Sequence, residues 1–260
     1  MSTPDGQVHL RIEDGIASVV FDRPEARNAM TWAMYESLVR ICEQLRDDAS
    51  VRVVRFRGAG GQAFVAGTDI AQFQDFRSGE DGVAYERRID GCMALLESLP
   101  MPTVAVLEGW AIGGGLAIAT ACDFRLATPG TRLGVPIART LGNCLSMANM
   151  ARLVAALGRP RAERVLLLAE LITAEEALAA GYLLEIAPPD AIAAASDKLC
   201  GRLAGLAPVT QRVSKQALNR LLHAGLPEGE DLIRACYGSA DFREGVAAFV
   251  GKRPPAWSGR

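Results

Sequence analysis

Histidine is scarce in this chain, and no pair of cysteines has the spacing of a metal or redox motif. His9 and His223 are the only two histidines, so we expect no histidine-rich metal site. The six cysteines are scattered without a C-x-x-C pair, which favours reduced thiols over a disulfide framework. The first fifteen residues lack the basic and apolar regions of a signal peptide, and we therefore expect a cytoplasmic protein.

The chain also lacks a large excess of either positive or negative charge. Twenty-eight basic residues face 30 acidic ones, for a net charge of −2, which gives no reason to expect nucleic acid or a membrane surface as a partner. Half of the residues are hydrophobic and 22% are charged, as is ordinary for a globular protein. A chain of 260 residues fits one large domain, or a core with an appendage.

Two nucleotide-binding signatures are absent, and one apolar stretch is interrupted. No G-x-G-x-x-G motif opens the first strand–helix unit, and no G-x-x-x-x-G-K-[ST] loop is present. Residues 103–122 are long enough to cross a membrane, but four clustered glycines and Glu108 break the stretch. We expect a buried strand, turn and helix there instead.

Residues 102–123 are the central stretch of the chain. Residues 103–107 predict a buried strand, 108–115 a glycine-rich turn, and 116–122 a buried helix. Such a turn presents free backbone N–H groups at the positive end of a helix dipole, and glycine lets a ligand approach them. These amides suit a phosphate or a developing oxyanion, although a turn needed only for packing remains an alternative.

A second glycine-rich turn lies upstream. Residues 58–67 follow a strand-like run at 51–56, and Asp69 is placed to cap a helix that begins at Ile70. Two strands, each followed by a turn with free amides, suggest that two N–H groups converge on one oxygen.

These motifs together resemble those of the crotonase family, the enoyl-CoA hydratase/isomerase superfamily. The likeness covers nearly the whole chain, with the motifs in the family's order. They are Phe21-Asp22-Arg23-Pro24 with Asn28-Ala29, Ala66-Gly67-Thr68-Asp69-Ile70, the stretch 102–123, Leu133-Gly134-Val135-Pro136, and Phe249-Val250-Gly251-Lys252-Arg253. The resemblance implies an α/β, crotonase-like (ClpP/crotonase) spiral of β-β-α units with a C-terminal helical domain.

The resemblance also implies a ligand and a site. The ligand is an acyl-CoA thioester, with no cofactor beyond that coenzyme A, and the protein forms homotrimers or hexamers. The backbone N–H groups of Thr68 and Gly114 bind the thioester oxygen and stabilise an enolate. The substrate-binding positions that it implies are Ala26, Arg27, Ala66, Ile70, Ala117, Ile137, Phe249 and Lys252.

Two positions depart from the pattern of the family's hydratases. Those enzymes carry one glutamate two residues after the Gly-Gly-Gly and another directly after the proline of the fourth motif. Here the two positions are Ala117 and Ile137, which cannot transfer protons. General acid–base catalysis contributes roughly 10²–10⁴-fold, so the sequence predicts an oxyanion hole without the hydratase acid–base pair.

Several polar residues are candidates to replace that pair, and each has a structural alternative. Asn143 and Cys144 follow the fourth motif, and Asp75, Tyr85 and Glu86 lie in or beside a variable loop that borders the acyl pocket. Isomerisation, decarboxylation, thioester hydrolysis and C–C bond chemistry stay open. A non-catalytic acyl-CoA-binding homologue or structural subunit, and a hydratase with a relocated base, are the other interpretations.

The remaining pattern predicts the element order. A hairpin turns at Asp14-Gly15, and Thr173 with Glu176 predicts a capping box. We expect further strands at 124–127, 132–133 and 183–186, and helices at 32–45, 83–99, 161–168, 173–180, 191–206, 209–223, 231–240 and 243–250. A boundary near residue 200 divides the spiral core, 1–200, from a helical trimerisation or lid region, 201–260.

Overall fold

The computed structural model describes residues 5–259, which contain a six-stranded and a four-stranded sheet. The larger sheet has the order β1-β2-β3-β5-β7-β10 and the smaller the order β4-β6-β8-β9. The strands are β1 (Gln7–Glu13), β2 (Ile16–Asp22), β3 (Val53–Gly58), β4 (Ala63–Val65), β5 (Thr103–Leu107), β6 (Trp110–Ile112), β7 (Phe124–Ala127), β8 (Arg132–Gly134), β9 (Ile172–Thr173) and β10 (Glu185–Ile186).

The chain alternates between the two sheets and so forms a spiral. β3, β5 and β7 are parallel neighbours in the larger sheet, and each is followed by a short strand of the smaller sheet, β4, β6 or β8. These short strands are also parallel neighbours. Helical segments then return the chain to the larger sheet, which gives repeated β-β-α turns.

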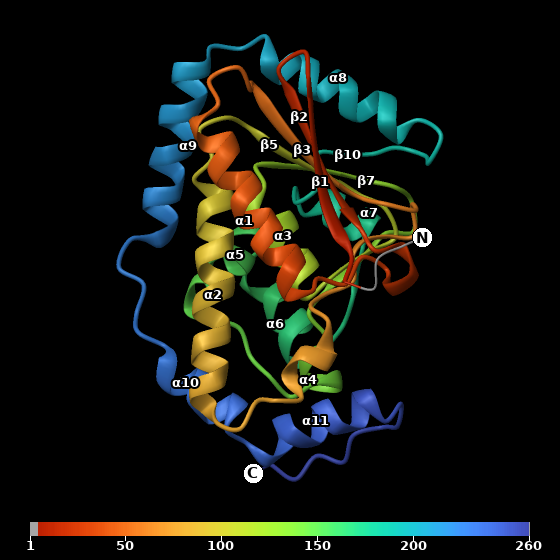
Figure 1. Ribbon diagram of the computed structural model, residues 1–260, viewed down its shortest axis with the longest axis vertical. Coiled ribbons are helices and arrows are strands. Elements are labelled where there is room, and N and C mark those ends of the chain that lie inside the picture. The colour runs from red at the N-terminus through yellow and green to blue at the C-terminus, as the bar shows by residue number, and fades with distance from the viewer. Residues whose placement is uncertain (1–4, 260) are drawn as a thin grey trace.

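Helices cover both faces of the larger sheet. Its strands alternate between two cores: Val54, Phe56 and Ala105 face the main core, while Val53 and Val104 face the core beneath α8 (Ile192–Ala204). The helices that begin before residue 180 are α1 (Trp32–Asp47), α2 (Gly79–Glu97), α3 (Gly114–Ala121), α4 (Ile137–Thr140), α5 (Met147–Leu157), α6 (Arg159–Leu167) and α7 (Ala174–Ala179), with 3₁₀ turns η1 (Pro24–Ala26) and η2 (Ile70–Phe73). α1 and α2 lie side by side in front of the sheets (Figure 1).

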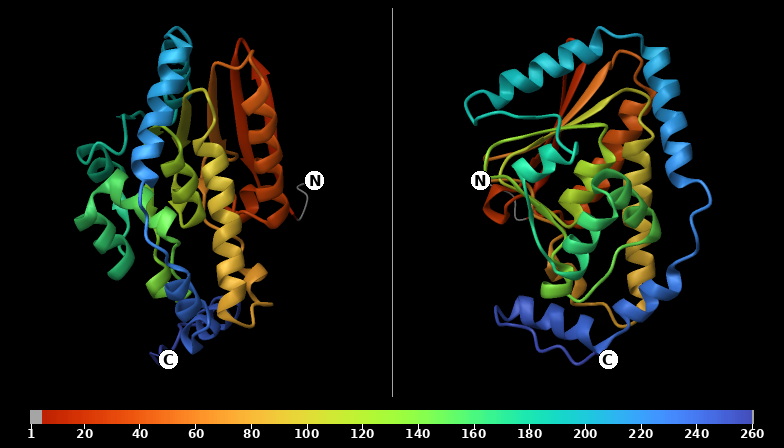
Figure 2. Two further views of the ribbon diagram at one scale, coloured as in Figure 1. Left: turned by 90° about the vertical axis from the view of Figure 1, so that its left-hand side faces the viewer. Right: turned by 180° about the vertical axis from the view of Figure 1, so that it is seen from behind.

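The C-terminal helices wrap around this core. They are α8 (Ile192–Ala204), α9 (Pro208–His223), α10 (Glu230–Tyr237) and α11 (Ala240–Val250). α8 and α9 run along the top and one side, and α10 and α11 form a layer below the core (Figures 1 and 2). α10 packs against α2, and α11 against η2 and α4. Residue 200 lies within α8, and the division into two regions stays a prediction.

The structure confirms most of the predicted helices and strands. The differences lie at helix ends and in the glycine-rich stretches, where capping residues and short strands are not evident from hydrophobic periodicity. The hairpin turns through Asp14 (φ 49°) and Gly15 (φ 76°). α2 begins at Gly79 rather than at residue 83, because Ser78 and Asp81 form a capping box. Thr173 accepts a hydrogen bond from the N–H of Glu176, but the Glu176 carboxylate pairs with Arg164, so that predicted capping box lacks its reciprocal half. β4 and β6 lie inside stretches that the sequence predicted to be glycine-rich turns.

The apolar stretch 103–122 forms β5, β6 and α3 in the interior. None of the helices that the model describes is long and apolar enough to cross a membrane.

Candidate active site

The carboxyl ends of three neighbouring parallel strands, β4, β6 and β8, meet at one edge of the smaller sheet. Such an edge is where ligands bind in parallel α/β sheets. The segments that leave the strands, 66–70, 113–117 and 135–137, line one side of a cavity of about 400 Å³. The segments that carry Thr68 and Gly114 thus follow the short strands β4 and β6, which the sequence did not predict, and do not directly follow the longer runs at 51–56 and 103–107.

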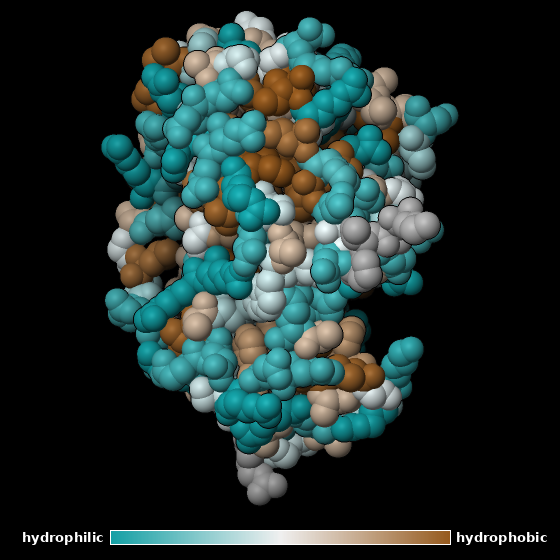
Figure 3. All heavy atoms as spheres, viewed as in Figure 1, coloured by the Kyte–Doolittle hydropathy of each residue, from teal (hydrophilic) through white to brown (hydrophobic). Residues whose placement is uncertain are grey.

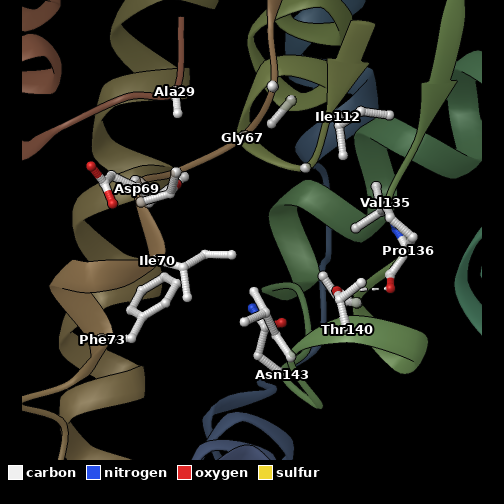
Figure 4. A pocket seen from close by; sticks show the side chains of 18 of the residues that line it. Ala29, Gly67, Asp69, Ile70, Phe73, Ile112, Val135, Pro136, Thr140 and Asn143 are labelled. Carbon is white, nitrogen blue, oxygen red and sulfur yellow. Dashed lines mark hydrogen bonds between the residues drawn. The ribbon is translucent and has the colours of Figure 1, made fainter. Parts of the chain in front are cut away.

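Apolar side chains from opposite sides face each other across this cavity. Ile70 and Phe73, the first and last residues of η2, lie opposite Val135 and Pro136 after β8, with Asn143 below them (Figure 4). The surface is hollowed between the body of the molecule and the layer that contains α11 (Figure 3). Phe249 of α11 lines the cavity, so the C-terminal layer contributes to the site.

Thr68 forms an isolated β-bridge with Met30, but its own backbone N–H takes no part in the hydrogen bonds of that bridge. The bridge to Met30 is made by its neighbours: Met30 N–H donates to the Gly67 carbonyl at 2.8 Å, and Asp69 N–H donates to the Met30 carbonyl at 2.8 Å. Backbone N–H groups alternate in direction along an extended segment, so the N–H of Thr68 points away from Met30. Within residues 5–259, no acceptor is recorded for it.

Gly114 presents a second N–H beside the first. It is the first residue of α3, and its amide therefore has no acceptor within the helix. Gly113 before it has φ 54°, and its own N–H donates to the Gly134 carbonyl at 2.9 Å. A Cβ placed on Gly114 would lie 3.8 Å from the Thr68 nitrogen, so the two turns are in contact. The arrangement can bind one oxygen that develops negative charge.

The cavity brings together most of the residues that the sequence singled out. Its lining includes Ala26, Arg27, Ala66, Thr68, Ile70, Gly114, Ala117, Ile137, Asn143 and Phe249. Cys144 and Lys252 are not among the lining residues. Lys252 follows α11 with a positive φ of 50° and is exposed. The roles of all these residues in binding and catalysis stay predictions.

Cys144 is a protonated thiol in this setting. A hydrogen bond with Cys236, followed by burial, raises the pKa of Cys144 far above its ordinary range. Its sulfur also lies 3.9 Å from the Leu232 carbonyl. A nucleophilic or basic cysteine requires a lowered pKa, which this environment does not provide.

Glu86 is a buried carboxyl group in the cavity wall. It lies on α2 between Val83 and Ile89, on the helix face that points inward, and is only 3% exposed. Tyr237 Oη donates to Oε1 at 2.7 Å, and the Ser146 N–H donates to Oε2 at 3.0 Å. Burial raises the pKa of Glu86 to about 7; the hydrogen bonds from Tyr237 and Ser146 oppose this rise, and the nearby Asp90 adds to it. A carboxyl group that titrates near neutral pH can both remove and return a proton.

The other carboxyl group in the lining, Asp69, is occupied structurally. It accepts from Arg23 at 2.7 Å and caps η2 through the Ala71 N–H at 3.1 Å. The predicted cap is therefore confirmed. Asp75 is exposed and is not a lining residue.

Asn143 and Asn149 add polar groups that face the same space. Asn143 Nδ2 donates to Tyr237 Oη at 3.1 Å, while its Oδ1 is buried and has no recorded partner. Asn149, whose role the sequence did not indicate, accepts from Arg152 at 3.1 Å and lines the cavity. Among residues 5–259, no group of three or more His, Cys, Asp or Glu side chains is placed to hold a metal ion.

The fold has close counterparts among solved structures. Methylmalonyl-CoA decarboxylase in complex with 2-nitronate-propionyl-CoA matches with a TM-score of 0.89 and 23% identity, covering 97% of this chain and 98% of that one. With the spiral of β-β-α turns and the C-terminal helices, this match defines the architecture as crotonase-like, as the sequence predicted.

The family follows from sequence comparisons. Residues 11–260 match the family model described as enoyl-CoA hydratase/isomerase. "Enoyl-CoA hydratase domain-containing protein 2, mitochondrial" of Mus musculus is 31% identical over 99% of this chain and 90% of its own length. "Enoyl-CoA isomerase/hydratase fer4" of Mycosarcoma maydis is 30% identical over 99% of this chain and 96% of its own. The chain belongs to the enoyl-CoA hydratase/isomerase family and is an enzyme of that family.

Proposed function

We propose that this enzyme forms the enolate of an acyl-CoA thioester and isomerises a carbon–carbon double bond in the acyl chain. The N–H groups of Thr68 and Gly114 bind the thioester oxygen, and Glu86 transfers the proton. Two free amides on touching turns and one buried carboxyl in the same cavity support this assignment.

The observation that carries the proposal is the environment of Glu86. Ala117 and Ile137 line the cavity, and we propose that they occupy the positions of the two hydratase glutamates, as the resemblance implies. Glu86 approaches the cavity from α2 with a pKa of about 7, while Asp69 is held by Arg23. The cavity therefore has one carboxyl group suited to proton transfer, and not a pair.

A single acid–base group suits a proton shift better than hydration. The Glu86 carboxylate removes a proton from C2 of a 3-enoyl thioester, and the electron pair of that C–H bond delocalises onto the thioester oxygen between the two amides. The resulting carboxylic acid then returns the proton to C4 and gives the 2-enoyl thioester, with no atom gained or lost. Hydration needs a second group to activate water, so we expect negligible hydration of short straight-chain 2-enoyl-CoA.

Conversion of 3-hexenoyl-CoA to the conjugated 2-enoyl thioester, followed by ultraviolet absorbance, tests the proposal. We expect turnover by the natural protein and a loss of at least roughly 100-fold in Glu86→Gln. Glu36→Gln, which changes an exposed glutamate on α1, is the matched control and retains activity. Undiminished isomerisation by Glu86→Gln, or crotonyl-CoA hydration by the natural protein at ordinary hydratase rates, contradicts the assignment.

The remaining expectations concern coenzyme A and assembly. We propose that Arg27, which lines the cavity, and Lys252 bind the phosphates of coenzyme A, and that this coenzyme, as part of the substrate, is the only cofactor. We also propose a homotrimer or hexamer, supported by exposed apolar side chains on α9. Six free cysteines support a location in the reducing cytoplasm.

A further inference from the structure

Three hydroxyl groups from three different elements are joined beside the two free amides. Tyr35 of α1 and Tyr85 of α2 both contact Thr68, with Oη–Oγ1 distances of 2.9 and 3.0 Å. Tyr35 is 2% exposed, whereas Tyr85 lines the cavity. The cluster has three protons and two hydrogen bonds, so one proton is left to donate elsewhere.

Burial decides which proton is left. Within the described part of the chain, Thr68 is the one hydrogen-bond partner recorded for the Tyr35 hydroxyl. A buried donor without an acceptor costs roughly 1–3 kcal/mol, so Tyr35 donates to Thr68. Thr68 in turn donates to Tyr85, and the Tyr85 proton remains free at the cavity. In the reverse order the Tyr35 proton would be stranded in the interior. If both tyrosines donated to Thr68, the free proton would be that of Thr68, which also lines the cavity, and Tyr85→Phe would then leave the thioester frequency unchanged.

The hydroxyl chain lies against both oxyanion turns. A Cβ placed on Gly114 would come 2.5 Å from Tyr35 Oη and 3.3 Å from Thr68 Oγ1. Thr68 carries both the middle hydroxyl and one of the free amides. Burial, and then the neighbouring Tyr35 and Glu86, raise the pKa of Tyr85 well above its ordinary value, so its hydroxyl stays protonated and acts as a donor.

We propose that the Tyr85 hydroxyl is a third donor to the thioester oxygen, in addition to the Thr68 and Gly114 amides. Tyr35 and Thr68 are positioning residues that orient this donor, because each donates its hydrogen bond to the next hydroxyl in the chain, from Tyr35 to Thr68 and from Thr68 to Tyr85. No bond other than hydrogen bonds changes in this role. The inference rests on the proposed function, since it requires that the thioester oxygen binds between the two amides.

Isotope-edited infrared spectroscopy of bound [1-¹³C]hexanoyl-CoA, a saturated thioester that does not isomerise, measures the donors directly. Hydrogen bonds lower the carbonyl stretching frequency. We expect a clear lowering in the natural protein, a smaller one in Tyr85→Phe, and a value between them in Tyr35→Phe. Turnover should fall by roughly 10- to 100-fold in Tyr85→Phe, as expected for one charge-assisted hydrogen bond.

Tyr182→Phe is the matched control. It removes another buried hydroxyl, which lies 2.9 Å from Thr120 Oγ1 and outside the cavity lining, and should leave the frequency unchanged. Thr68→Val keeps the shape of that side chain while breaking the hydroxyl chain, and it also should reduce the lowering, which provides a second variant if Tyr85→Phe folds poorly.

Two negative results are distinguishable. A lowered frequency that is identical in the natural protein, Tyr85→Phe and Thr68→Val overturns the third donor and leaves the two amides in place. Absence of hexanoyl-CoA binding, or an unshifted carbonyl in the natural protein, overturns the oxyanion site on which the proposed function rests, and the third donor with it.

Discussion

At the scale of single residues, the proposed chemistry depends on the buried environment of Glu86. Removing this side chain from water disfavours its charged form, and two hydrogen bonds restore part of the lost stabilisation. The result is a pKa of about 7, where the group is divided between base and acid at neutral pH. An exposed glutamate would remain ionised and would return a proton to carbon less readily.

The first prediction concerns the donor that holds Glu86. The Tyr237 hydrogen bond favours the carboxylate, so Tyr237→Phe should raise the pKa of Glu86 further. Because the base must be ionised, kcat/KM should rise with pH through about 7 in the natural protein. In Tyr237→Phe the rise should shift to higher pH, with activity at pH 7 reduced and largely recovered at pH 9. An unchanged or more acidic midpoint would show that another group titrates.

The second prediction concerns two aliphatic residues that line the cavity, Ala117 and Ile137. Ala117→Glu with Ile137→Glu should introduce measurable crotonyl-CoA hydration, because both positions face the cavity. The gain should be small, since two new carboxylates would lack supporting hydrogen bonds. Ala117→Gln with Ile137→Gln is the uncharged control. Equal hydration by the glutamine control would contradict the prediction, because it would show that proton transfer by the new carboxylates is not the cause of the gain.

At the scale of elements, α9 is fastened to the strand–helix core by a partly buried ion pair. Lys215 of α9 donates to Asp123 Oδ2 at 2.7 Å and to the Met101 carbonyl at 3.2 Å. Asp123 also accepts from the Thr103 N–H at 2.8 Å, so the same carboxylate holds the start of β5. β5 and α9 are therefore coupled through the carboxylate of Asp123.

The third prediction tests that coupling. Lys215→Met keeps the aliphatic stem but leaves the Asp123 carboxylate unpaired, and should lower the free energy of unfolding by about 2 kcal/mol. Urea denaturation at a fixed protein concentration measures the change. Lys198→Met, at an exposed position on α8, is the control and should change little. Equal stabilities of the two variants would mean that the pair does not fasten α9.

The elements also show what the sequence can and cannot predict. The hairpin and β5 follow from Asp-Gly turn chemistry and from a continuous apolar run. β4 and β6 have three residues each within glycine-rich segments, so neither has a readable period. The resemblance, and not local periodicity, singled out Thr68 and Gly114, and the structure places their two turns in contact. The setting of Glu86 was not predictable, because its partner Tyr237 lies 151 residues away in the chain.

At the scale of the whole molecule, the C-terminal helices leave apolar side chains in contact with solvent. On α9, Val209, Val213, Leu218 and Leu221 are 55–76% exposed. Several exposed apolar side chains on one helix favour burial of that helix against another molecule. The helix lies along one outer side of the core, where it is open to a second copy (Figure 2).

The fourth prediction is that this surface joins copies of the chain. Sedimentation of the natural protein at micromolar concentration should show trimers or hexamers, and Leu218→Glu with Leu221→Glu should shift the distribution toward the monomer. Arg40→Glu on α1 is a charge-changing control away from α9. A monomeric natural protein, or a double variant with unchanged mass, would contradict a role for α9 in assembly.

The central claim is that Glu86 moves a proton at the carbon next to the thioester, and hydrogen–deuterium exchange tests it most directly. Hexanoyl-CoA incubated with the enzyme in D₂O at pD near 7.5 should gain deuterium at C2, as measured by mass spectrometry, whether or not a double bond is present. Glu86→Gln should bind the same thioester and exchange at least roughly 100-fold more slowly, because the oxyanion amides remain and the base is gone. Exchange by Glu86→Gln at the rate of the natural protein would contradict the assignment of Glu86.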